Sequence, residues 1–162
     1  MRVIVKFSNP MNGLGRRWCA VLALAICVSE PCFAKTLAVI VDKSNTLAGM
    51  TVADLSKMFK FDSRKWPDGR DVVLVLPGPA TPEMQILVEK LYHMQPGEVK
   101  NLLASHKNIV IANSEEQMLK SVETIPGALG LVDVYDITSR VNILRVNGKL
   151  PLEQGYVLHS GQ

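Results

Sequence analysis

The sequence has little cysteine, few aromatic residues and no excess of charge beyond its N-terminal segment. Its three cysteines, Cys19, Cys27 and Cys32, all precede residue 35, and aromatic residues make up 6% of its 162 residues. Residues 35–162 can therefore form neither a disulfide nor a cysteine-based metal site, and they offer no thiol nucleophile. They also carry equal numbers of acidic and basic side chains, which argues against a nucleic-acid-binding domain.

The motifs of the common enzyme classes are absent as well. The sequence has no Gly-x-Ser-x-Gly elbow, no phosphate-binding loop with Gly-Lys-Ser, no Gly-x-Gly-x-x-Gly and no His-Glu-x-x-His. His93, His106 and His159 have no second histidine or carboxylate at the spacing of metal ligands. Asp133 and Asp136 could form a metal site or an acid–base pair, but carboxylates after a strand more often cap a loop. We therefore predict a protein that is not an enzyme and that holds no metal or cofactor.

The first 34 residues have the three-part pattern of a secretory signal peptide. Arg16 and Arg17 form a basic region, an apolar run of 11 residues extends from Trp18 to Val28, and Ala34 is a small residue at the expected cleavage point. The run is shorter than the roughly 20 residues that span a bilayer. We expect cleavage after about Ala34 and export to the periplasm. A buried N-terminal helix, a retained anchor and lipid attachment at Cys27 are the alternatives.

After the predicted signal peptide, short apolar runs alternate with amphipathic segments that begin with helix-capping residues. The apolar runs predict buried strands, and the caps predict helices. Strands are expected at residues 37–41, 72–76, 109–111, 128–132 and 141–146, and helices beginning at Thr51, Thr81, Pro96 and Ser114. This alternation is typical of an α/β fold, with a parallel or mixed sheet covered on both faces. We predict one domain at residues 35–150, followed by a loose tail at residues 151–162.

Two places in this pattern could bind an anion. Thr81 begins a helix directly after a buried strand, where the free N–H groups of a helix can hold an oxyanion. Glu83 would repel that oxyanion if it points into the crevice, so a simple helix start is the alternative. The second place is the basic cluster around Trp66, which includes Arg64 and Arg70. We favour solvated loop charges for this cluster, with an anion site or a site for an acidic partner as the alternative.

Several stretches carry a resemblance to a known family. They are Leu55–Phe59 with Arg64–Gly69, Val72–Leu76, Asn113–Leu119, Ile125–Val132, and Val141–Gly148 with Pro151 and Tyr156. In this order and spacing they resemble the phosphate-binding periplasmic proteins of ABC transporters, in particular short relatives with one lobe. The resemblance implies a single α/β lobe of the type II periplasmic-binding fold, with a mixed, mostly parallel sheet flanked by helices. Family members capture oxyanions such as phosphate in a cleft between two lobes.

The resemblance leaves two functions open. In the first, the chain is a solute-binding protein for an ABC transporter: Thr81, Ser44 and Asn45 hold a phosphate-like oxyanion, and Arg64 adds a charge-assisted contact. A two-lobed clamp needs about twice this chain, so a homodimer would supply the missing lobe. In the second, the chain is a periplasmic accessory protein that keeps the lobe without the ligand. It would then bind a partner such as a membrane sensor or a transporter component.

Overall fold

The computed structural model describes residues 35–160. The predicted signal peptide, with all three cysteines, lies outside the described residues. Within residues 35–160, no helix combines the length and the apolar character that crossing a membrane requires.

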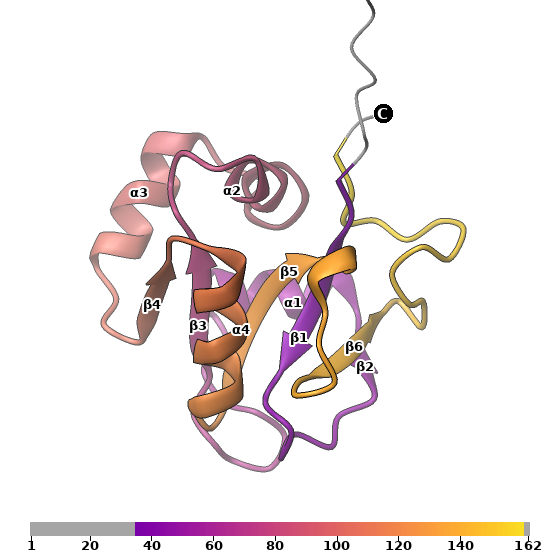
Figure 1. Ribbon diagram of the computed structural model, residues 1–162. Helices are drawn as coiled ribbons and strands as arrows, with labels where there is room; N and C mark the ends of the chain where they lie inside the picture. Colours follow the sequence, from indigo (N-terminus) through magenta and orange to yellow (C-terminus); the bar gives the residue numbers. More distant parts are fainter. Residues whose placement is uncertain (1–34, 161–162) are drawn as a thin grey trace, which may run out of the picture. The chain divides into compact units, whose positions relative to one another are not determined.

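A mixed six-stranded sheet forms the centre of the domain, in the order β2-β6-β1-β5-β3-β4 (Figure 1). The strands are β1 (Leu37–Val41), β2 (Gly49–Met50), β3 (Val73–Pro77), β4 (Ile109–Ala112), β5 (Ala128–Asp133) and β6 (Asn142–Val146). The pairs β2–β6, β3–β4 and β3–β5 are parallel, whereas β1 is antiparallel to both of its neighbours, β5 and β6. The predicted α/β fold with a mixed, mostly parallel sheet is confirmed.

The helices begin where their capping residues predict. They are α1 (Val52–Phe59), α2 (Pro82–Leu87), α3 (Pro96–Ala104) and α4 (Glu115–Thr124). The side chains of Thr51, Thr81 and Ser114 each accept a hydrogen bond from the backbone N–H three residues later. α2 continues into a π-helical turn, η1 (Val88–Tyr92), and a short 3-10 helix, η2 (Val134–Asp136), follows β5. The helix after Thr81 was expected, but neither its π-helical end nor η2 was predicted.

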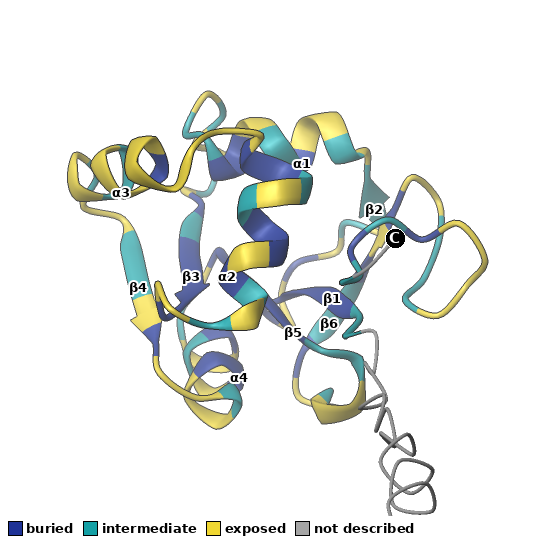
Figure 2. Cartoon of the chain, turned by 90° about the horizontal axis from the view of Figure 1, so that it is seen from above, coloured by how far each residue is buried: buried dark blue, intermediate teal, exposed yellow. Residues whose placement is uncertain are grey.

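The helices cover both faces of the sheet, which makes three layers (Figure 2). Leu37, Val39 and Val41 of β1 belong to one apolar core with residues of α1, α2, η1 and α3. Ala38 and Ile40, the alternate residues of the same strand, belong to a second core with α4. Because all five side chains are fully buried, β1 is apolar throughout.

The C-terminal segment differs from the prediction. Residues 151–160 do not form a loose tail, because Tyr156 and Leu158 are buried in the core. The Tyr156 hydroxyl donates to the Leu37 carbonyl at 2.8 Å, and the Leu37 N–H donates to the Leu158 carbonyl at 2.8 Å. The segment therefore belongs to the domain and packs beside the start of β1.

Candidate functional site

A crevice of about 300 Å³ lies where β3 and β4 end and where α2 and α4 begin. Its walls include Thr81 and Glu83 at the start of α2, Ser114 and Glu115 at the start of α4, and Lys35 just before β1. The carboxyl ends of parallel strands meet at this edge of the sheet, which is where α/β proteins bind ligands. The crevice is thus in the predicted position, and its chemistry depends on which groups face it.

The Thr81 hydroxyl is already used within the chain. It accepts a hydrogen bond from the Met84 N–H at 3.3 Å and donates to the Gly78 carbonyl at 2.9 Å. The next residue, Pro82, has no N–H to offer. An incoming oxyanion would therefore have to break the cap of α2 in order to use Thr81.

Glu83 points into the crevice, which answers the question that the sequence left open. Its carboxylate accepts a hydrogen bond from the Lys35 ammonium, and only 12% of its side chain is exposed. Burial acts to raise the pKa of Glu83, but hydrogen bonds from Lys35 and from its own backbone N–H outweigh burial and lower the pKa. Glu83 is therefore a fixed negative charge at the start of α2, the position that favours an anion.

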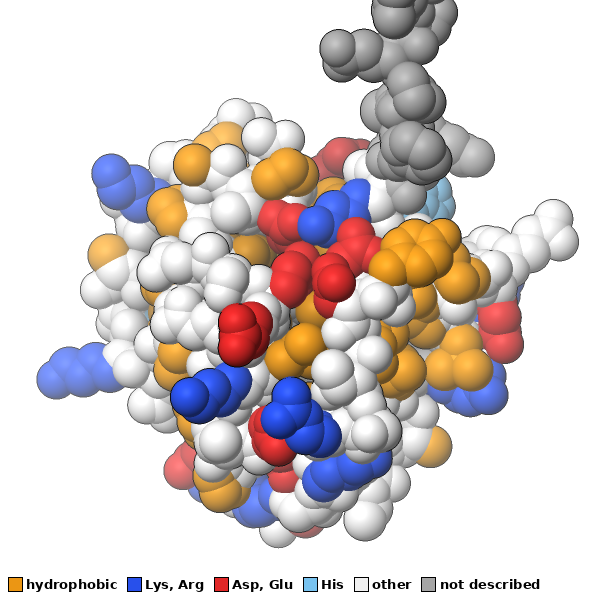
Figure 3. Space-filling model, viewed as in Figure 1, with side chains coloured by type: hydrophobic (Ala, Val, Ile, Leu, Met, Phe, Trp, Pro, Cys, Tyr) orange, Lys and Arg blue, Asp and Glu red, His pale blue; other side chains and the backbone are white. Residues whose placement is uncertain are grey.

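Lys35 is shared among several carboxylates. Its Nζ lies 3.4 Å from Glu115 and 3.6 Å from Asp133, in addition to its contact with Glu83. Burial acts to lower the pKa of Lys35, but the hydrogen bonds and charges of Glu83 and Glu115 raise it. Burial raises the pKa of Glu115, and the charges of Glu83 and Asp136 act in the same direction. Acidic side chains gather around a basic one on this face of the molecule (Figure 3), so the crevice is net negative.

Asp133 and Asp136 belong to the same acidic group, since Asp133 contacts Lys35 and the charge of Asp136 acts on Glu115. Asp133 caps η2, since its carboxylate accepts a hydrogen bond from the Tyr135 N–H at 3.0 Å. Between the two aspartates, the Tyr135 side chain is 83% exposed. Among residues 35–160, no cluster of histidine, cysteine and acidic side chains has the arrangement of a metal site.

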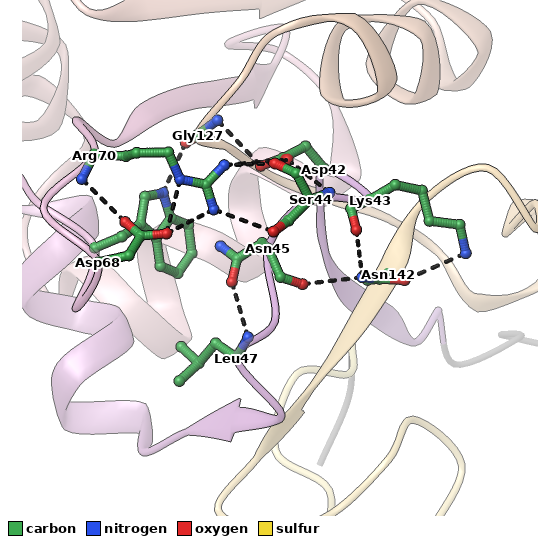
Figure 4. Close-up of polar contacts among 10 residues, drawn as sticks. Asp42, Lys43, Ser44, Asn45, Leu47, Asp68, Arg70, Gly127 and Asn142 are labelled. Atoms are coloured by element: carbon green, nitrogen blue, oxygen red, sulfur yellow. Dashed lines mark hydrogen bonds and ion pairs between the residues drawn. The ribbon is translucent and has the colours of Figure 1, made fainter.

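Ser44 and Asn45 lie at the opposite edge of the sheet, because β1 is antiparallel to β5 and ends away from the crevice. Both belong to a polar network (Figure 4). Ser44 Oγ accepts a hydrogen bond from Arg70 at 2.6 Å, and Asn45 Oδ1 accepts one from the Leu47 N–H at 3.0 Å. The network is centred on the buried Asp42, which contacts Arg70 at 3.4 Å. Ser44 and Asn45 thus stabilise the turn after β1.

The same network explains the two stretches that most resemble the phosphate-binding family. In Trp-Pro-Asp-Gly, the buried Trp66 donates through Nε1 to the Gly127 carbonyl at 2.9 Å. In Pro-Gly-Ala-Leu-Gly, the Gly127 N–H donates to Asp42 at 3.1 Å. Gly127 has a φ of +78°, and a Cβ there would lie 2.3 Å from the Asp71 carbonyl oxygen. The two stretches therefore contact each other and stabilise the edge of the sheet opposite the crevice.

Arg64 does not reach the crevice either. It follows α1, and its Nη2 lies 3.3 Å from Nε2 of His106, which precedes β4. The structure therefore does not bring Thr81, Ser44, Asn45 and Arg64 into one site. The crevice depends instead on Lys35 and Glu115, which the sequence analysis did not select. The sequence signals for them were a charged residue two positions before a buried strand and an acidic residue at the first position of α4.

Comparison with known proteins supports the fold. No protein-family model matches the sequence, and no curated protein does. Solved structures do match. PstS from Borrelia burgdorferi has a TM-score of 0.66 and 14% identity, over 78% of this chain and 55% of that one. A putative phosphate ABC transporter substrate-binding protein with bound phosphate, from Clostridium perfringens, has a TM-score of 0.61 and 17% identity. This match covers 71% of this chain and 46% of that one.

An ABC-type phosphate transport receptor from Vibrio cholerae matches in the same way, with a TM-score of 0.59 and 15% identity over 73% of this chain and 48% of that one. The chain thus spans about half the length of the structures that it matches. The resemblance predicted from the sequence is confirmed at the level of the fold. The chain has the fold of the phosphate ABC transporter substrate-binding proteins over about half of their length.

Proposed function

We propose that this chain is an exported, periplasmic accessory protein, which keeps one lobe of the solute-binding fold and binds a protein partner through its crevice face. The observation that carries the proposal is the position of Glu83. Its carboxylate takes the Lys35 ammonium and its own backbone N–H as hydrogen-bond donors. These are the groups that would otherwise hold an oxyanion at the start of α2.

Electrostatics favours this proposal over capture of free phosphate. Two unit charges of like sign 4 Å apart repel by about 4 kcal/mol at the effective dielectric of a protein surface. A hydrogen bond to a charged group contributes only about 1.5–3 kcal/mol. An anion in the crevice would meet Glu83, Glu115 and Asp133, which already share Lys35. Three carboxylates around one ammonium leave the crevice net negative. The carboxylates therefore repel an anion more strongly than Lys35 attracts it.

The crevice face indicates the chemistry of the partner. It presents a surplus of carboxylates next to the exposed ring of Tyr135. A basic segment of a partner protein would complement these charges, and a cationic side chain could also stack on the tyrosine ring. We propose that this partner is a membrane sensor or a component of a transporter.

Phosphate binding for an ABC transporter is the second candidate, and the fold match together with the crevice at the start of α2 favours it. In that case the Glu83 carboxylate would have to leave Lys35 when phosphate enters. Lys35 and the Thr81 hydroxyl would then hold the phosphate.

Calorimetric titration with inorganic phosphate distinguishes the two functions. The protein is expressed from its full sequence, purified from the periplasmic fraction, and compared as wild type, Glu83→Gln and Thr81→Val. We expect no phosphate binding in the wild-type crevice. Glu83→Gln removes one of the three carboxylates around Lys35, so phosphate binding at the crevice should appear only in this variant and should be lost when Thr81→Val is added. Phosphate binding by the wild type that Thr81→Val abolishes would refute the accessory function in favour of solute binding.

A further inference from the structure

A second hollow, of about 350 Å³, lies at the opposite edge of the sheet from the crevice. It is bounded by the loop after α1 and by the residues that precede β3 and β4. Arg64 and Lys107 give it positive charge, and His106, Ser63 and Asn108 add hydrogen-bonding groups. None of the described residues that line it is acidic. Its charge is therefore opposite to that of the crevice.

Hydrogen bonds hold Arg64 and His106 in place. The His106 Nδ1 lies 2.8 Å from the Leu102 carbonyl, which can only accept, so Nδ1 carries a proton. The Arg64 guanidinium is always a donor, and its Nη2 lies 3.3 Å from His106 Nε2, which accepts. The Arg64 Nε donates to the Phe61 carbonyl at 3.3 Å. These two contacts fix the guanidinium at the hollow and leave further N–H groups for an anion.

Phe61 forms an aromatic wall of the hollow at a cost in backbone conformation. It follows the end of α1 with a φ of +65°, where its N–H donates to the Met58 carbonyl at 3.1 Å. Glycine is usual at this position, because a Cβ is unfavourable in the left-handed region. The Phe61 ring stacks on the His106 ring, with centroids 3.8 Å apart and an angle of 6° between the rings. Unfavourable backbone of this kind concentrates at functional sites.

We propose that this hollow binds a small carboxylate with an apolar body. Arg64 and Lys107 hold the carboxylate, since a guanidinium fork matches its two oxygens. The body lies against Phe61 and against the side chains of Met58 and Leu74, which also line the hollow. A water molecule takes about 30 Å³, so the volume accommodates roughly ten non-hydrogen atoms. Benzoate is a probe of this size. Inorganic phosphate would gain nothing from the apolar walls, and the site is independent of the function proposed for the crevice.

Calorimetric titration with benzoate, benzamide and inorganic phosphate tests the site on the wild-type protein. We expect a dissociation constant of about 1 mM or tighter for benzoate, and affinity lower by roughly tenfold or more for benzamide, which has the shape without the charge. Arg64→Gln should weaken benzoate binding by roughly tenfold. The control Lys120→Gln, on the exposed surface of α4, should bind benzoate like the wild type.

Phe61→Gly separates loss of the site from loss of the fold. Glycine relieves the backbone at this position and offsets part of the packing lost with the ring, so the melting temperature should fall by only about 5 °C or less while benzoate binding weakens. The proposal would be overturned by a wild type that does not bind benzoate, or by equal benzoate affinity in Arg64→Gln and Lys120→Gln. Phosphate binding as tight as benzoate binding would overturn the apolar part of the assignment.

Discussion

Replacing Lys35 with methionine removes the ammonium that Glu83, Glu115 and Asp133 share. Removing one partner from a buried ion pair costs about 3–5 kcal/mol, because the remaining charge is left without a partner. Here 27% of the Lys35 side chain and 12% of the Glu83 side chain are exposed, so water screens part of the interaction. We expect Lys35→Met to lower the free energy of unfolding by about 1–3 kcal/mol at neutral pH.

The pH dependence of this loss follows from the directions of the pKa shifts. The folded protein lowers the pKa of Glu83 below its ordinary 4.5, so the stabilisation is present above pH 4.5 and is lost as the pH falls through the lowered pKa. The pKa of Lys35 is raised above its ordinary 10.5, so its stabilisation is present below pH 10.5 and is lost as the pH rises through the raised pKa. The difference between wild type and Lys35→Met should therefore be full near neutrality and should shrink at both extremes.

Urea unfolding of wild type, Lys35→Met and the exposed control Lys120→Met, at a series of pH values from about 7 down to about 2, measures this difference. The double variant Lys35→Met with Glu83→Gln should recover part of the loss at neutral pH, because the carboxylate that lost its partner is then uncharged. A loss that stays equal over the whole series would mean that Lys35 stabilises the crevice by packing alone. The electrostatic account of the crevice would then be wrong.

Three further predictions concern the edge of the sheet opposite the crevice and the N-terminus. Gly127→Ala should cost about 1–3 kcal/mol more than Gly69→Ala in thermal unfolding, because both have positive φ but only at Gly127 would a Cβ collide, with the Asp71 carbonyl. Trp66→Phe should lower the free energy of urea unfolding by about 1–3 kcal/mol, since it removes the hydrogen bond to Gly127 and leaves a cavity. Mass spectrometry of the periplasmic protein should find Lys35 as its first residue; cleavage beyond Lys35 would contradict its role in the crevice.

Local patterns predicted most of the fold because they depend on neighbours in the chain. The apolar run at residues 37–41 is buried on both faces, and the caps at Thr51 and Thr81 begin helices. β2 has only two residues, and its pairing with Arg145 and Val146 of β6 creates it, so no local pattern marks it. The burial of residues 151–160 likewise depends on contacts with the start of β1 across more than 100 positions.

Strand direction explains why the predicted site residues do not meet. A buried apolar run looks the same in the sequence whether the strand is parallel or antiparallel to its neighbours. Grouping Ser44 with Thr81 assumed that β1 and β3 end at the same edge. β3 is parallel to β5 and β1 is antiparallel to it, so the two strands end at opposite edges. The direction of β1 follows from its antiparallel pairing with β5, which the folded structure shows and the sequence pattern does not.

The crevice shows how such a nonlocal pair can change a binding site. Thr81, read with its neighbours, indicates a helix start that could hold an anion, and Glu83 alone leaves that possibility open. Lys35, 48 residues earlier in the chain, argues against an anion there, because its ammonium already contacts the Glu83 carboxylate. If phosphate binds to the neutral Glu83→Gln, the Glu83 carboxylate alone keeps the anion from Lys35. If phosphate does not bind to this variant, Glu115 of α4 and Asp133 of β5 are sufficient to exclude the anion. The exclusion then depends on several carboxylates and not on Glu83 alone.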